Sequence, residues 1–142
     1  MKALDCFLIE YSDSSFTNPH EVALAVAPPD RKGQFTHMGA QYWGFETGRH
    51  IGTKIKADVQ QFNFRPNAGH FLCLGLKSRS LVTQIDIDTR WFTGNHVPEV
   101  TVILEDADQQ VIVLSHQALS PNEPHHFEIP PTQAERCRVL CH

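Results

Sequence analysis

The chain has 142 residues, 41% hydrophobic and 20% charged, which is an ordinary composition for one globular domain with a real core. Its 16 acidic and 12 basic residues give a formal net charge of −4. This balance argues against a general nucleic-acid or membrane-surface binder, which would carry a basic face. No run of about 18 apolar residues is present, so we expect no membrane-spanning segment. We predict a single domain over residues 1–142.

The N-terminus and the cysteines bear on where the protein works. The first residues have too short an apolar run for a signal peptide, with an acid already at Asp5. The four cysteines include no Cys-x-x-Cys pair, so a structural zinc site has no support. With no export signal, we expect reduced cysteines and a cytoplasmic protein.

Short apolar or alternating runs recur along the chain and predict β-strands. The expected strands are residues 4–11, 70–76, 80–90, 99–105, 110–115, 126–129 and 135–141. Residues 21–27 and 53–64 fit either a strand or a helix. Residues 106–109 are expected to connect a hairpin, and residues 65–69 and 120–124 to form turns. With no helical stripe longer than three turns, this spacing favours an all-β antiparallel sandwich or jelly roll.

The most polar of these strands is the one over residues 80–90. Ile85 and Ile87 alternate with Asp86 and Asp88, which is typical of a half-buried strand. The two carboxylates therefore share one face. The strand then runs into a turn-forming Thr-Gly-Asn segment, so several hydrogen-bonding side chains gather at one strand end. By contrast, His125 and His126 precede a strand and are expected to be exposed.

Two segments together resemble the allantoicase family. Residues 44–49, Gly-Phe-Glu-Thr-Gly-Arg, are similar to the family's Gly-Trp-Glu-Thr-Arg-Arg signature. Residues 86–98 carry Asp-Ile-Asp-Thr-x-x-Phe-Thr-Gly-Asn-x-x-Pro, similar to its Asp-Val-Asp-Thr-x-x-Phe-Thr-Gly-Asn-Tyr-Pro-Pro signature. Between them, Gly69-His70-x-x-Cys73 is similar to the family's Gly-His-Asp-Trp-Cys, and residues 35–39 to its Phe-Thr-x-x-Gly. The resemblance covers roughly residues 35–129.

The resemblance implies a jelly-roll β-sandwich of the galactose-binding-domain-like kind. It also implies a hydrolase that acts on a ureido compound, splitting allantoate into ureidoglycolate and urea. Family members carry two such domains and form oligomers, so a homo-oligomer, with a dimer favoured, is expected here. On this basis the candidate catalytic residues are Glu46, Arg49, Asp86 and Asp88, and the candidate substrate-binding residues are Thr47, His70, Thr93, Asn95 and His96.

Each candidate has a chemical reason and a plainer structural reading. Arg49 offers the bidentate match for a substrate carboxylate, and Glu46 could act as a base or accept ureido N–H groups. Asp86 and Asp88 could accept such groups, or bind a divalent metal together with two histidines. The plainer structural interpretations are a surface or loop arginine, a buried glutamate that satisfies loop backbone, and two carboxylates at a solvated or loop-capping strand edge. We predict no cofactor and no dedicated metal site, although a divalent metal stays possible.

Two alternatives to a hydrolase stay open. Trp43 and Gly48 stand where the family carries an acid and an arginine, which favours a non-catalytic jelly roll that binds a small polar ligand or a carbohydrate. Retention of Glu46, Arg49 and the two aspartates favours the hydrolase. A third alternative is a subunit whose sheet edges and aromatic side chains serve assembly.

Overall fold

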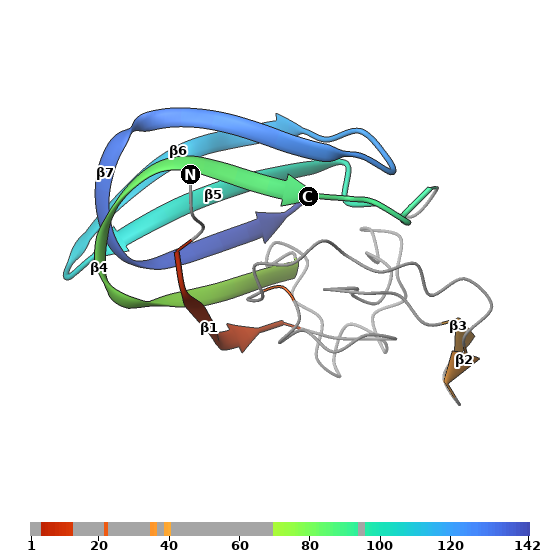
Figure 1. The fold of residues 1–142 in the computed structure, drawn as a ribbon, viewed down its shortest axis with the longest axis horizontal. Helices are drawn as coiled ribbons and strands as arrows, with labels where there is room; N and C mark the ends of the chain where they lie inside the picture. Colours follow the sequence, from red (N-terminus) through yellow and green to blue (C-terminus); the bar gives the residue numbers. More distant parts are fainter. Residues whose placement is uncertain (1–3, 13–21, 23–34, 37–38, 41–69, 94–95) are drawn as a thin grey trace, which may run out of the picture.

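A computed structural model describes residues 4–12, 22, 35–36, 39–40, 70–93 and 96–142, and these are nearly all in antiparallel β-sheet. The main sheet has five strands in the order β1-β4-β7-β5-β6 (Figure 1). Two short strands, β2 and β3, form a separate pair. The strands are β1 (Cys6–Tyr11), β2 (Phe35–Thr36), β3 (Gly39–Ala40), β4 (His70–Asp88), β5 (Glu99–Asp106), β6 (Gln109–Ala118) and β7 (Pro124–Cys141).

Strands β4 and β7 are long, and both curve round so that their two halves lie in different layers (Figure 1). The first half of β4 pairs with the end of β7, from His70 opposite Cys141 onward. The second half pairs with the start of β7 and ends with Asp88 opposite Pro124. At the bend, residues 76–79 of β4 face a single residue of β7. Such a bulge bends a strand pair without ending it, so one continuous pair supplies both layers of the sandwich.

The core lies between these layers and follows the period-2 pattern of the strands. One buried cluster joins β4, β5 and β7, and the other centres on β5 and the segment after β6. The buried members are Val82, Val100, Val102, Leu104, Leu119, Ile129 and Ala134. Ile85 and Ile87 pack against these clusters, which turns the neighbouring aspartates outward.

The predicted strands are found, but in two places a pair of predicted strands is one continuous strand in the structure. Residues 70–76 and 80–90 belong to one strand, and so do 126–129 and 135–141. Pro130 and Pro131 are accommodated within β7 because the pairing register shifts there, where proline's missing N–H removes no ladder bond. The hairpin connection is shorter than predicted, with Ala107 at a φ of 53° in the two-residue turn between β5 and β6.

Other sequence expectations lie outside the described residues or were matched. Residues 53–64 and 65–69, and all of 21–27 except residue 22, are outside the described part of the chain. The turn expected over residues 120–124 is present just before β7. Within the described ranges, no helix is long and apolar enough to cross a membrane.

A charged cluster on the outer face of the sheet ties β1 to the strands beyond its neighbour. Arg138 of β7 donates from Nε to Glu105 of β5 at 2.9 Å and from Nη1 to Glu10 of β1 at 3.1 Å. The Glu105 side chain is only 7% exposed, whereas Arg138 is 28% exposed. The hydrogen bond from Arg138 is the main cause that lowers the pKa of Glu105. The stability of the sheet is therefore expected to depend on Arg138, because it is the cationic partner of the nearly buried Glu105 carboxylate.

Candidate functional site

The end of β4 presents the two aspartates on one outward face, as their spacing predicted. Both residues are exposed, and they alternate with the half-buried Ile85 and Ile87. The paired strand is the start of β7, so its outward residues lie on the same face. This strand end, together with the turn over residues 119–125 that precedes and enters β7, is the candidate site.

Asp86 forms an acid–imidazole pair with His126, which lies directly opposite on β7. The His126 Nδ1 lies 2.9 Å from the Asp86 carboxylate, and the Gln84 amide donates to the same oxygen at 2.6 Å. Partial burial raises the pKa of Asp86, but the hydrogen bonds from Gln84 and His126 outweigh it and lower the pKa overall. An ionised Asp86 accepts the Nδ1–H of His126, which leaves the lone pair of a neutral imidazole on Nε2. His126 is 65% exposed, so solvent can reach this ring.

Asp88 is paired within its own turn. Its carboxylate accepts the backbone N–H of Arg90 at 2.9 Å and the Nε–H of the same residue, also at 2.9 Å. Burial raises the pKa of Asp88, but these bonds from Arg90 outweigh it and lower the pKa overall. The next residue, Trp91, has a φ of 75°, and its N–H is held by the Asn122 side chain. Asp88 therefore stabilises the sharp exit from β4, in line with its plainer reading.

Thr89 and His125 fix the turn over residues 119–125 beneath this face. The buried Thr89 hydroxyl lies 2.7 Å from the Ser120 carbonyl oxygen and 3.0 Å from that of Glu123. The His125 Nε2 accepts the Ser120 N–H at 2.9 Å, so its Nδ1–H donates to the Ile87 carbonyl at 3.0 Å. The His125 side chain is 11% exposed, and the expectation that it would be exposed was wrong. The ring can be largely buried because both of its nitrogens bond to backbone.

His96 reaches the same turn from the other side. Its Nε2 lies 3.2 Å from the Leu119 carbonyl oxygen, to which it donates. Its Nδ1 is buried and has no hydrogen-bond partner in the described part of the chain. His96 and Asp88 therefore both lie next to the turn over residues 119–125.

The remaining predicted residues are placed elsewhere or are not described. His70 opens β4 in the other layer, where its Nδ1 lies 3.3 Å from the Ser12 hydroxyl. Thr93 is exposed beyond the end of β4. The four candidates that lie outside the described residues are Glu46, Thr47, Arg49 and Asn95. The predicted roles of Glu46, Thr47, Arg49 and Asn95 in the site are therefore untested.

Sequence reasoning missed two partners of the aspartates. Arg90 follows Asp88 by two residues, a spacing that places both on one side of an extended chain and could have signalled the pair. The pairing of His126 with Asp86 depends on the register between strands 40 residues apart, which no local pattern reveals. Within residues 4–12, 70–93 and 96–142, no three His, Cys, Asp or Glu side chains come together as a metal-binding group.

Comparisons with known proteins agree with the fold. Residues 1–140 match the allantoicase family, described as the allantoicase repeat. The chain is 34% identical over 101 residues to the probable allantoicase of Schizosaccharomyces pombe, covering 71% of this chain and 26% of that protein. It is 26% identical over 131 residues to the allantoicase of Saccharomyces cerevisiae, covering 84% of this chain and 34% of that protein.

A solved allantoicase structure superposes on 96% of this chain with a TM-score of 0.67 and 20% identity, and the match covers 36% of that longer chain. The predicted fold class, an all-β jelly-roll sandwich, is confirmed. This chain spans only about a quarter to a third of the length of the curated relatives it matches.

Proposed function

The chain belongs to the allantoicase family, and from this premise we propose that it is an allantoicase-like hydrolase acting on a ureido compound, with allantoate as the first candidate. In this reaction a water oxygen bonds to the central carbon of allantoate. The bond from that carbon to one ureido nitrogen breaks, and that nitrogen takes up a proton. The products are ureidoglycolate and urea.

The reaction needs a group that removes a proton from water and a group that holds the substrate carboxylate. The Asp86–His126 pair is the observation that supports the first need. Its carboxylate orients the imidazole so that Nε2 carries the lone pair, on a side chain that is 65% exposed, which is the arrangement of a general base. We assign the base to His126 and its orientation to Asp86. Arg49 is the proposed clamp for the substrate carboxylate.

The other predicted residues have supporting roles in this proposal. Glu46 and Thr47 bind the substrate together with Arg49, while Thr93, in the loop after β4, and Asn95 bind its polar groups. Asp88 holds that loop through Arg90, and His96 holds the turn over residues 119–125 through Leu119. No step of this proposal requires a metal ion.

A comparison of three variants in a urea-release assay tests the assignment. His126→Gln and Asp86→Asn are expected to lower kcat about 100-fold or more, because a positioned base contributes about 10²–10⁴-fold. Glu128→Gln is the matched control, since Glu128 is exposed on the same face of β7, two residues further on. Equal kcat values for His126→Gln and the control would remove His126 from the mechanism, provided that circular dichroism shows both variants folded.

The second candidate function is a binding module for a small polar ligand. The observation that favours it is the pairing of Asp88 with Arg90, which occupies one predicted catalytic carboxylate within the chain's own turn. Calorimetric titration with allantoate separates the two functions. Binding without urea release supports the module, and urea release supports the hydrolase.

We also propose that the protein works in the cytoplasm. All four cysteines are free thiols in the structure, which suits a reducing compartment. Burial also raises the pKa of Cys137 to about 12 and that of Cys141 to about 11. Such thiols stay protonated and unreactive at neutral pH.

A further inference from the structure

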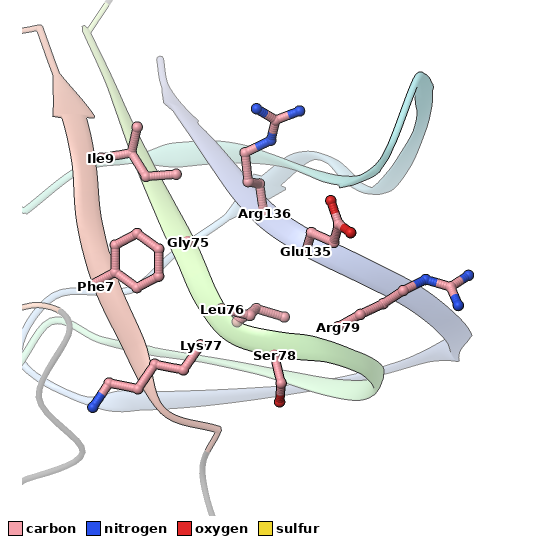
Figure 2. A pocket seen from close by; sticks show the side chains of 9 residues that line it. All are labelled: Phe7, Ile9, Gly75, Leu76, Lys77, Ser78, Arg79, Glu135 and Arg136. Atoms are coloured by element: carbon pink, nitrogen blue, oxygen red, sulfur yellow. The ribbon is translucent and has the colours of Figure 1, made fainter.

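A shallow groove lies on the main sheet where β1 and β7 flank the bend of β4. It has a volume of about 380 Å³, and Figure 2 shows the side chains that line it. β1 contributes Phe7 and Ile9, the bend of β4 contributes Lys77 and Ser78, and β7 contributes Arg136. No residue of the candidate functional site lines this groove. What it binds is therefore independent of the proposed hydrolysis.

The apolar part of the groove is built around the ring of Phe7. Figure 2 shows this ring leaning from β1 over β4 at Gly75, where a Cβ atom would lie 2.4 Å from the ring. A side chain at position 75 would displace the ring, so the glycine lets it lie against the strand. Phe7 and its neighbour Ile9 are nevertheless 47% and 46% exposed. The groove thus offers an accessible aromatic surface on which a flat ring can stack.

Three cations line the groove, and they differ in their carboxylate partners. Arg79 is fully paired, because its Nε and Nη2 donate to the two oxygens of Asp106 at 2.9 and 2.7 Å. Arg136 lies 3.8 Å from Glu105, which is beyond hydrogen-bond distance. Among the described residues, no carboxylate pairs with the Lys77 ammonium. Lys77 and Arg136 are therefore the two cations that can still pair with a ligand.

The charge of the groove favours a ligand with a single negative charge. Its lining has three cations and one acid, Glu135, on a chain whose formal net charge is −4. Because Asp106 already neutralises Arg79 and Glu135 opposes one of the other cations, about one positive charge is left uncompensated. A carboxylate matches this charge, whereas a doubly charged phosphate would also meet the nearby acids.

We propose that this groove binds a small planar carboxylate, with its ring stacked on Phe7 and its carboxylate held by Lys77 and Arg136. Figure 2 shows these two cations on either side of the Phe7 ring. A guanidinium matches a carboxylate with two parallel N–H donors, and the flexible lysine side chain brings its ammonium to the same group. The Ser78 hydroxyl at the same bend is a further donor. A neutral ring would leave the cations unused, and an inorganic anion would leave Phe7 unused.

An NMR titration of the full wild-type chain with three probes tests the proposal. The probe 1-naphthoate carries both ring and carboxylate, acetate carries the carboxylate alone, and 1-naphthylmethanol carries the ring alone. We expect 1-naphthoate to shift the amide signals of Gly75 and Ser78 saturably, with a dissociation constant of about 1 mM. Each partial probe should bind about fivefold more weakly or worse. No saturable shift at these amides, or a partial probe that binds as tightly as 1-naphthoate, would overturn the proposal.

Substitutions in the groove identify the groups that hold the probe. Lys77→Met and Arg136→Met should each raise the dissociation constant of 1-naphthoate about fivefold, and Phe7→Leu, which keeps an apolar side chain but removes the ring, should do the same. Arg79→Met is the matched control, because Arg79 lines the same groove but its guanidinium is already bound to Asp106. Its effect should be less than about twofold. Unchanged binding in Lys77→Met and Arg136→Met, or an equal loss in the control, would contradict the proposed site.

Discussion

Replacing Arg138 by methionine should destabilise the protein more than the loss of an ordinary surface cation. The Glu105 carboxylate is 7% exposed and would lose the donor that lies 2.9 Å away. Removing one partner of a buried ion pair costs about 3–5 kcal/mol. Because Arg138 is itself 28% exposed, and Arg136 remains 3.8 Å from Glu105, we expect the lower end, about 3 kcal/mol. This loss corresponds to a fall in Tm of about 10 °C.

The dependence on pH follows from the carboxylate. Arg138 lowers the pKa of Glu105 below its ordinary value of 4.5. Its stabilising contribution is therefore complete above pH 4.5 and is lost as the pH falls through the lower folded pKa. The difference in unfolding free energy between wild type and Arg138→Met should accordingly narrow below pH 4.5. Urea denaturation at pH 7 and at several lower pH values measures this change.

Two further variants make the result interpretable. Arg79→Met removes a cation of the same kind whose ion pair with Asp106 is exposed to solvent, and it should lower the stability far less than Arg138→Met does. The double variant Arg138→Met, Glu105→Met removes both charges of the pair, and it should recover much of the lost stability. If Arg138→Met cost no more than Arg79→Met, the argument that Glu105 needs a cationic partner would be refuted.

Two other predictions concern the turn and the thiols. Thr89→Val should cost about 1–3 kcal/mol in urea denaturation, because it removes the hydroxyl of a buried residue that bonds the Ser120 and Glu123 carbonyls. Thr132→Val, whose hydroxyl bonds a nearby carbonyl in the same strand, should cost well under 1 kcal/mol, and equal losses would argue against the role of Thr89. At pH 8, iodoacetamide should leave Cys137 and Cys141 unmodified in the native protein, because burial raises the pKa of both thiols. Mass spectrometry measures the modification, and rapid alkylation of either thiol would contradict their burial.

The strands could be predicted from sequence because each has a local period. Alternation placed Ile85 and Ile87 inward and the two aspartates outward, as found. The local period could not predict that two neighbouring runs belong to one continuous strand, as they do in β4 and β7. Pro130 and Pro131 suggested an interruption, yet β7 passes through them at a register shift. Continuity across such a bend depends on the partner strand, which local sequence does not specify.

The candidate site was only partly predictable for the same reason. The positions of Asp86 and Asp88 follow from spacing along one strand. The base proposed for the reaction, His126, meets Asp86 only through the register between β4 and β7. His125 was misjudged because its burial depends on the Ser120 and Ile87 backbone groups that it bonds. A single sequence reports such long-range pairings poorly.

The central claim, that this chain hydrolyses a ureido compound, is tested most directly by urea release from allantoate. The purified chain would be incubated with allantoate, with and without added divalent metal, and urea would be quantified over time against a buffer control and the His126→Gln variant. We predict urea production by wild type at a rate proportional to protein concentration, and much slower production by the variant. Urea release no faster than the buffer control in both conditions would contradict the claim.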